Sequence, residues 1–201
     1  SKVMAQKVPV KVVKLMKIFT MAFVASILLA SATRPSRTFQ LPWSPRRGVW
    51  PEPRKLIDKN VDGPNTSQMV FDPWSFTHVT HGVVGYVLYR GICRVLKVTA
   101  NDCATHASKA FAVLFVLELV WEMVENSNYV VDRYRKSYRK YKGDSLVNSL
   151  GDIYSCLLGF FMASWNMEVA LFYVFASEYL LWPNGLIGGV STVFNPPTKS
   201  M

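Results

Sequence analysis

Acidic residues are absent from the first 51 positions of the chain, whereas five lysines stand among the first 17. Charge is scarce elsewhere as well, because charged residues make up 18% of the 201-residue sequence, against about 25% in typical soluble domains. Half of the residues are hydrophobic, and they are gathered in runs. This pattern indicates a membrane protein, in which the net charge of +10 favours contact with anionic lipid over nucleic acid.

Cysteine is scarce too. The three cysteines, Cys93, Cys103 and Cys156, form neither a C-x-x-C pair nor a zinc-finger spacing. Their number and spacing exclude a disulfide-rich framework. Cys93 and Cys103 would pair if the loop between them faced an oxidising compartment, but the spacing alone favours free thiols.

Common enzyme signatures are also missing. The sequence has no H-E-x-x-H motif, no Glu-x-x-His motif of di-metal bundles, no glycine-rich phosphate loop, no Ser-His-Asp signature and no haem motif. Any acid–base or metal chemistry must therefore come from scattered polar residues.

Apolar runs predict an all-α fold: a polytopic transmembrane helical bundle of about five spans. The expected spans are 18–32, 75–93, 108–126, 144–165 and 169–182. Crossing a bilayer takes roughly 20 residues, so the first and last runs are short. The first run also has a basic flank and an A-x-A-like site, as signal peptides do, but we interpret it as a span.

The spans divide the chain into three parts. Residues 1–66 form a basic extension with one span and most of a long Pro- and Trp-rich connection, residues 67–182 a four-helix membrane bundle, and residues 183–201 an irregular tail. Five spans would put 14 of the 23 Lys and Arg residues on the side that holds 33–74 and 127–146. That side is predicted to be the cytoplasm or matrix.

Polar residues interrupt three of the runs at helical spacing. Ionisable side chains at membrane depth almost always face the protein interior or a water-filled cavity. With up-and-down connectivity, the three polar stripes fall at the same end of the bundle. The predicted polar core or ligand site comprises His78, His81, Glu118, Glu122, Glu125, Asn126, Asp144, Asn148 and Asp152.

Two interpretations of this cluster stay open. Imidazole and carboxylate ligands suit zinc, iron or manganese, so His78, His81, Glu122 and Glu125 are candidate ligands of a divalent metal. The other interpretation is a hydrogen-bonded polar core in which His78 and His81 pair with Glu122 and Glu125. The lack of a specific signature favours the polar core, and we assign no catalytic residue.

The segment "DRYRKSYRKYK" interleaves tyrosine with basic residues between two expected spans. Nucleic-acid interfaces have a similar composition, but basic segments beside a membrane typically contact lipid phosphates. The predicted headgroup site, for a phospholipid or cardiolipin, comprises Arg133, Arg135, Arg139, Lys140 and Lys142.

Four stretches carry a family resemblance: "SQMVFDPWSFTHVTHG" (67–82), "ELVWEMVENS" (118–127), "DRYR" (132–135) and "YKGDSLVNSLGDIYSCLLGF" (141–160). In order and spacing they resemble a family of small integral membrane proteins of alphaproteobacterial type, catalogued as a domain of unknown function. The resemblance covers residues 67–182. The Arg-Asp-Asn-Leu type element of that family looks degraded here to "WPNGLIGG".

The resemblance and the basic extension together imply the mitochondrial inner membrane. We therefore expect a non-catalytic accessory subunit of a respiratory-chain or ATP synthase complex, in contact with other subunits and anionic lipid. The alternative is a membrane-embedded metal-binding protein or enzyme that uses the His/Glu/Asp cluster.

Overall fold

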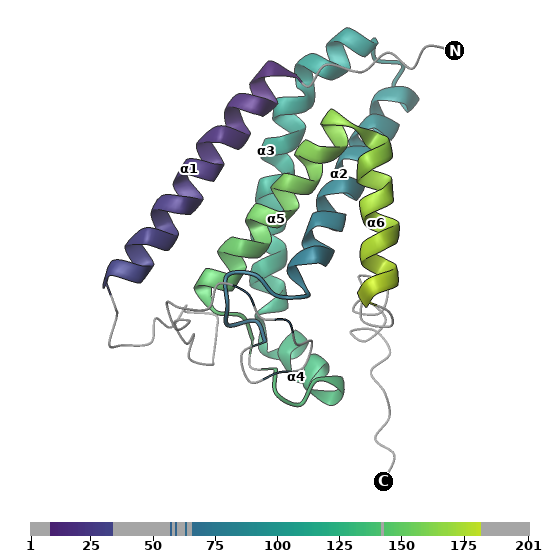
Figure 1. Ribbon diagram of the computed structural model, residues 1–201. Coiled ribbons are helices and arrows are strands. Elements are labelled where there is room, and N and C mark those ends of the chain that lie inside the picture. The colour runs from purple at the N-terminus through teal and green to yellow at the C-terminus, as the bar shows by residue number, and fades with distance from the viewer. Residues whose placement is uncertain are drawn as a thin grey trace.

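The computed structural model describes residues 9–33, 57, 59, 63, 66–141 and 143–181, and within these ranges it is built from helices (Figure 1). The prediction of an all-α fold is confirmed. The helices are α1 (Val10–Thr33), α2 (Ser75–Val95), α3 (Ala100–Glu125), α4 (Asn128–Ser137), α5 (Leu146–Trp165) and α6 (Met167–Leu181).

Helix α5 organises the bundle, since it contacts α1, α2, α3 and α6. The core forms where Phe160 of α5 meets Val83 of α2 and Phe111 of α3, all of which are at most 1% exposed. The rings of Phe111 and Phe160 pack edge to face with centroids 5.5 Å apart. The short helix α4 lies across the end of the bundle at which α2 and α5 begin (Figure 1).

Two glycines bring α2 and α5 into backbone contact. A Cβ atom added to Gly159 would lie 1.9 Å from the carbonyl oxygen of Val79, and one added to Gly82 would lie 1.8 Å from that of Cys156. Any larger residue would force the helices apart. The contact therefore sets the position of His78, next to Val79, relative to Asp152 on α5.

Side chains define where α2 and α5 begin. The Asp72 carboxylate accepts hydrogen bonds from the backbone amides of Trp74 at 2.8 Å and Ser75 at 3.2 Å. The Ser145 hydroxyl accepts one from the amide of Asn148 at 3.2 Å, so α5 begins just after residue 145. Both devices satisfy amide groups that the first helical turn leaves unpaired.

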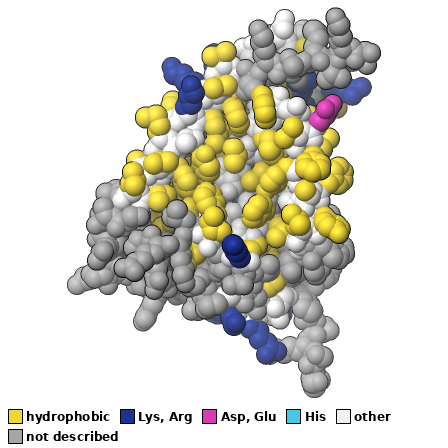
Figure 2. Space-filling view, in the orientation of Figure 1, with side chains coloured by type: hydrophobic (Ala, Val, Ile, Leu, Met, Phe, Trp, Pro, Cys, Tyr) yellow, Lys and Arg dark blue, Asp and Glu magenta, His cyan; other side chains and the backbone are white. Residues whose placement is uncertain are grey.

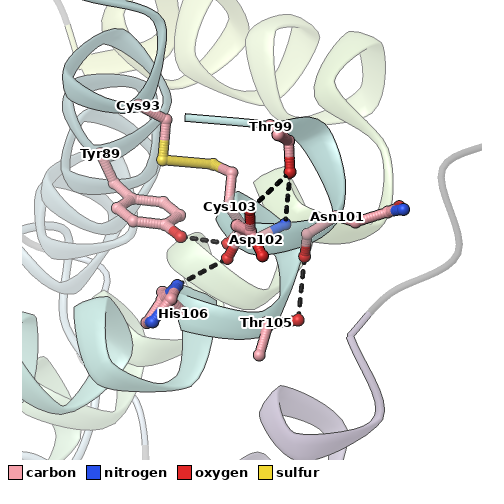
Figure 3. Close-up of a disulfide and its surroundings, with 8 residues drawn as sticks. All are labelled: Tyr89, Cys93, Thr99, Asn101, Asp102, Cys103, Thr105 and His106. Atoms are coloured by element: carbon pink, nitrogen blue, oxygen red, sulfur yellow. Dashed lines mark hydrogen bonds between the residues drawn. A yellow bond between two sulfur atoms is a disulfide. The ribbon is translucent and has the colours of Figure 1, made fainter. Parts of the chain in front are cut away.

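A disulfide joins Cys93 near the end of α2 to Cys103 in the first turn of α3, with Cα atoms 6.1 Å apart (Figure 3). The expectation of free thiols at these positions is therefore wrong. The turn between Val95 and Ala100 brings the two helix ends together, which the sequence spacing alone does not reveal. The Tyr89 hydroxyl donates a hydrogen bond to the carbonyl oxygen of Cys103 beside the disulfide.

One helix in the described part of the chain, α5, is both long and apolar enough to cross a membrane. Helices do occupy all five predicted runs, but the prediction of about five spans is not confirmed. Ionisable side chains such as Arg90 and Arg94 of α2 and Glu118 of α3 lower the hydropathy of their helices.

Large apolar side chains nonetheless cover the outside of the bundle. Figure 2 shows them across the middle of one face, with Lys and Arg side chains toward its edges. The exposed ones include Leu88 of α2, Leu117 of α3 and Phe172 of α6, which are 62%, 59% and 75% exposed. Most of the Pro- and Trp-rich connection and the tail from residue 182 lie outside the described residues.

Candidate functional site

The predicted polar residues come together at the α4 end of the bundle. Helix α2 brings His78 and His81, α3 brings its three glutamates, and α5 brings Asp152 and Asn148. The Gly82 and Gly159 contact holds α2 against α5 at this level. The structure thus places the stripes of three helices around one point, His78, which is 3% exposed.

His78 has a carboxyl group on each side of its ring. Its Nδ1 lies 2.5 Å from Oε1 of Glu118 and 3.6 Å from Oε1 of Glu122. Its Nε2 lies 3.9 Å from Oδ2 of Asp152 and 4.0 Å from Oε2 of Glu125. The short contact with Glu118 fixes the ring orientation, and it leaves Nε2 facing two carboxyls beyond direct hydrogen-bonding distance.

His81 lies at the margin of the cluster. Its Nδ1 is 3.6 Å from Oε1 of Glu118, and its side chain is 22% exposed. Its ring meets that of Trp121 edge to face, with centroids 5.9 Å apart. His81 therefore faces the outer side of Glu118, while His78 occupies the inner side.

Several buried polar atoms of the cluster have no hydrogen-bond partner. They include both carboxylate oxygens of Glu122, Oε2 of Glu125 and both amide atoms of Asn148. Glu122 is 6% exposed and Asn148 is fully buried. Buried polar groups without partners cost about 1–3 kcal/mol each, and charged groups cost more. Such atoms call for partners that the described side chains do not supply, such as a water molecule or an ion.

Asp152 is tied to the start of α2 through Ser75. The Ser75 hydroxyl donates to Oδ1 of Asp152 at 2.6 Å, while the Ser75 amide is bound by Asp72. Burial, reinforced by the charge of Asp144, raises the pKa of Asp72 from 3.8 to about 6. Asp72 is not among the site residues predicted from the sequence. The signal was the "DPWS" stretch, whose Asp and Ser are typical residues at a helix start.

Asn126 and Asp144 join the end of α3 to the segment before α5. The Asn126 amide donates to Oδ2 of Asp144 at 2.8 Å, and the Asp144 backbone amide donates to Oδ1 of Asn126 at 2.7 Å. The Tyr141 hydroxyl donates to the same carboxyl at 3.2 Å. Burial raises the pKa of Asp144 above its ordinary value. These two predicted site residues thus brace the cluster from its α4 side.

A small pocket, with about 20 Å³ of space for water-sized molecules, lies between the cluster and α4. Aromatic rings and carboxyl groups line it, with His78 among them. Its lining consists of Thr66, Ser67, Trp74, His78, Glu125, Tyr134, Tyr138, Tyr141, Asp144 and Asp152. The side of His78 that faces Asp152 and Glu125 is therefore also the side that adjoins open space.

The predicted lipid-binding residues lie on and just after α4. Arg133 stacks over the ring of Tyr129, at 4.8 Å from its centroid, and the Nε of Arg135 donates to the carbonyl oxygen of Tyr141. Arg139 and Lys140 are exposed, and Lys142 lies outside the described residues. Headgroup binding at these positions stays a prediction.

Among the described residues, two groups of side chains have ligand atoms close enough to share a metal ion. One is His78, His81 and Glu118, and the other is His78, Glu122 and Asp152; in each group the ligand atoms lie within 4.8 Å of one another. In the first group Glu118 already pairs with His78 at 2.5 Å, whereas in the second both Glu122 oxygens are unpaired. The second group is therefore the better candidate.

The protein is thus a helical bundle with a buried His–carboxylate cluster at one end. Its sequence matches the model of a family described as "Protein of unknown function (DUF2585)" over residues 52–182. The chain belongs to this family. The match confirms the resemblance predicted from the sequence and extends it upstream of residue 67.

Curated relatives come from alphaproteobacteria. A UPF0314 protein of Brucella anthropi is 37% identical over 100 residues, which cover 49% of this chain and 46% of that protein. A UPF0314 protein of Agrobacterium fabrum is 30% identical over 151 residues, 70% of each chain. One of Paracoccus denitrificans is 36% identical over 112 residues, 55% of this chain and 53% of that protein. The chain thus spans about half the length of the Brucella and Paracoccus relatives. No solved structure matches it.

Proposed function

We propose that this protein is a polytopic membrane protein that binds one divalent cation, such as zinc or manganese, through His78, Glu122 and Asp152. The observation that carries the proposal is Glu122, whose two oxygens are buried without a hydrogen-bond partner beside a histidine. An ionised carboxyl in that position costs several kcal/mol unless a cation compensates it. A metal ion bound to Glu122 would supply that compensation.

Glu118 supports the proposal by its contact with Nδ1 of His78, while the ligand atoms of His78, Glu122 and Asp152 lie within 4.8 Å of one another. Histidine ligands of metals usually donate one ring N–H to a carboxylate, which fixes the ring and leaves the other nitrogen for the metal. Here Glu118 faces Nδ1 at 2.5 Å, and Nε2 faces Asp152 at 3.9 Å. Two metal–ligand bonds of about 2.0–2.2 Å each can span such a gap.

Helix lengths and surface composition support the membrane part of the proposal. Helices α1, α2, α3 and α5 have 24, 21, 26 and 20 residues, and roughly 20 residues cross a bilayer. The described part of α6 has 15 residues. Exposed apolar side chains on the outer faces suit contact with lipid tails.

Metal analysis of the purified, detergent-solubilised chain tests the proposal. After incubation with zinc or manganese and removal of free metal, we expect about one ion per chain by inductively coupled plasma mass spectrometry. Glu122→Gln keeps the side-chain shape and should weaken binding at least tenfold. Glu168→Gln, an exposed glutamate in the first turn of α6, is the matched control and should bind as the wild type does. A metal-free wild type, together with a Glu122→Gln variant of higher stability, would contradict the proposal.

An accessory-subunit role, predicted from the sequence, is the second candidate. It is supported by the outer face of α6, where Phe172, Phe175, Tyr179 and Leu180 are between 72% and 82% exposed. Helices of neighbouring subunits commonly cover such faces. Location in the mitochondrial inner membrane stays a prediction, since the relatives named above are bacterial. Native electrophoresis of mildly solubilised membranes tests the role, and migration as a monomer would count against it.

A further inference from the structure

The two ends of the bundle differ in polarity: buried apolar side chains lie on the disulfide side of the cluster, and a pocket lined by carboxyl groups lies on its α4 side. Resting on the proposed function, we infer that the cation site is reached only from the α4 end, and that this end faces the reducing side of the membrane. The Cys93–Cys103 end then faces the oxidising side. Four features of the molecule support this: an apolar layer, a pocket, a disulfide and the distribution of basic residues.

An apolar layer separates the cluster from the disulfide end. The apolar layer between the cluster and the disulfide includes Val83, Phe111 and Phe160, each at most 1% exposed. A divalent cation that passed this layer would lose its hydration without gaining ligands. Taking even a single charge from water into such surroundings costs several kcal/mol after relaxation. The disulfide end is therefore closed to ions.

The α4 side is built in the opposite way. The pocket that adjoins His78 is lined there by Glu125, Asp144 and Asp152 and by tyrosines from α4 and its flank. Carboxyl groups attract and partly replace the water of a divalent cation as it moves inward. A cation can therefore enter through this pocket, whereas the apolar layer blocks entry from the disulfide end.

The disulfide marks the compartment at the other end. Cys93 follows His78 by 15 residues on α2, and Cys103 precedes Glu118 by 15 residues on α3, so each lies about 22 Å along its helix from the cluster. Disulfides persist in oxidising compartments and are reduced in the cytoplasm. The α2–α3 turn is therefore on the oxidising side, and the cluster is near the other side.

Basic residues give the same orientation by an independent rule. Arg135, Lys136 and Arg139 lie in and beside α4, and the connections and the C-terminal tail on that side hold 14 of the 23 Lys and Arg residues if five helices span the membrane. Loops rich in Lys and Arg stay on the cytoplasmic side. Redox chemistry and charge distribution thus agree on which end is inside.

Thiol labelling tests the orientation. The chain is produced in a bacterial inner membrane, and spheroplasts and inverted vesicles present its two faces. A membrane-impermeant maleimide should label the thiol introduced by Lys136→Cys, at an exposed site of α4, in inverted vesicles only. In spheroplasts it should label the thiol introduced by Lys97→Cys, at an exposed site of the turn between α2 and α3. Cys156 is fully buried and serves as the blank. Labelling of both ends from one face, or the reverse pattern, would overturn the inference.

Zinc release tests the access route. Zinc-loaded protein is placed in liposomes, sorted by orientation with the same label, and exposed to external EDTA. We expect zinc to leave at least tenfold faster from liposomes with α4 outside. Equal rates from both orientations would overturn the access route. Absence of zinc from every preparation would instead overturn the proposed function, whatever the labelling shows.

Discussion

Replacing Gly82 by alanine tests whether the contact between α2 and α5 sets the geometry of the cluster. The new Cβ would lie 1.8 Å from the carbonyl oxygen of Cys156 and 2.7 Å from the amide nitrogen of Phe160, whereas real Cβ atoms essentially never approach within 3.0 Å. Both neighbours are backbone atoms that cannot rotate away. Helix α5 must therefore move by at least 1.2 Å to restore 3.0 Å from the 1.8 Å contact.

Such a movement has two measurable consequences. Forcing an extra carbon into a packed contact typically costs about 1–3 kcal/mol of unfolding free energy. Metal–ligand distances tolerate only about 0.2 Å, so a displacement of this size between His78 and Asp152 should remove one ligand. We expect zinc affinity to fall at least tenfold, which corresponds to about 1.4 kcal/mol.

Gly91→Ala is the matched control, because nothing lies within 4 Å of a Cβ at this position of the same helix. It should leave zinc affinity unchanged and raise stability by about 0.5–1 kcal/mol, since alanine restricts the unfolded chain more than glycine does. Thermal unfolding in detergent, followed by circular dichroism, and zinc competition with a chromogenic chelator measure both effects. If the thermal stability and the zinc affinity of Gly82→Ala equal those of the wild type, this account of the contact is refuted.

Three further changes test other parts of the site. Glu118→Gln should weaken zinc binding about 10–100-fold, because it removes the carboxylate that orients His78, and an unchanged affinity by competition titration would contradict this role. Asp72→Asn removes a carboxyl whose pKa is raised to about 6 and which therefore binds its proton more tightly in the folded than in the unfolded state. The stability of the wild type relative to this variant should fall by roughly 2–2.5 kcal/mol as the pH rises from 4 to 7, measured by thermal unfolding at several pH values, and a relative gain would refute the argument. Cys93→Ser, combined with Cys103→Ser, opens a loop of about ten residues and should lower stability by about 2–3 kcal/mol without changing zinc affinity.

Helix positions could be predicted because each apolar run carries its own signal of length and periodicity. The end of the bundle at which the polar residues meet could be predicted as well, because up-and-down connectivity determines which helix ends are neighbours. The disulfide could not, since ten residues between Cys93 and Cys103 are compatible with many loop shapes. It depends on the short turn that places the ends of α2 and α3 together.

The pairing inside the cluster also lay beyond the sequence. Helical spacing puts Glu118, Glu122 and Glu125 on one stripe, but the vertical offset between α2 and α3 decides which of them meets His78. The direct partner is Glu118 at 2.5 Å, while Glu122 stands 3.6 Å away. The offset between the helices follows from tertiary contacts such as the one at Gly82. In the sequence, such a contact is visible only as a glycine.

The carboxyl groups of the cluster require positive charge to balance them. Four carboxyl groups lie within 4.0 Å of His78, those of Glu118, Glu122, Glu125 and Asp152. In the absence of metal, a charged His78 would balance one of them and protons would have to balance the rest, whereas a bound divalent ion, which requires a neutral His78, would balance two. A protonated carboxyl still needs an acceptor for its hydrogen, whereas both Glu122 oxygens lack a partner and a metal would bind them directly. Protons and metal then compete for the same oxygens, so zinc affinity should rise with pH. The stability term from Asp72 falls with pH, and these opposite slopes separate ion binding from the titration of the surrounding carboxyls.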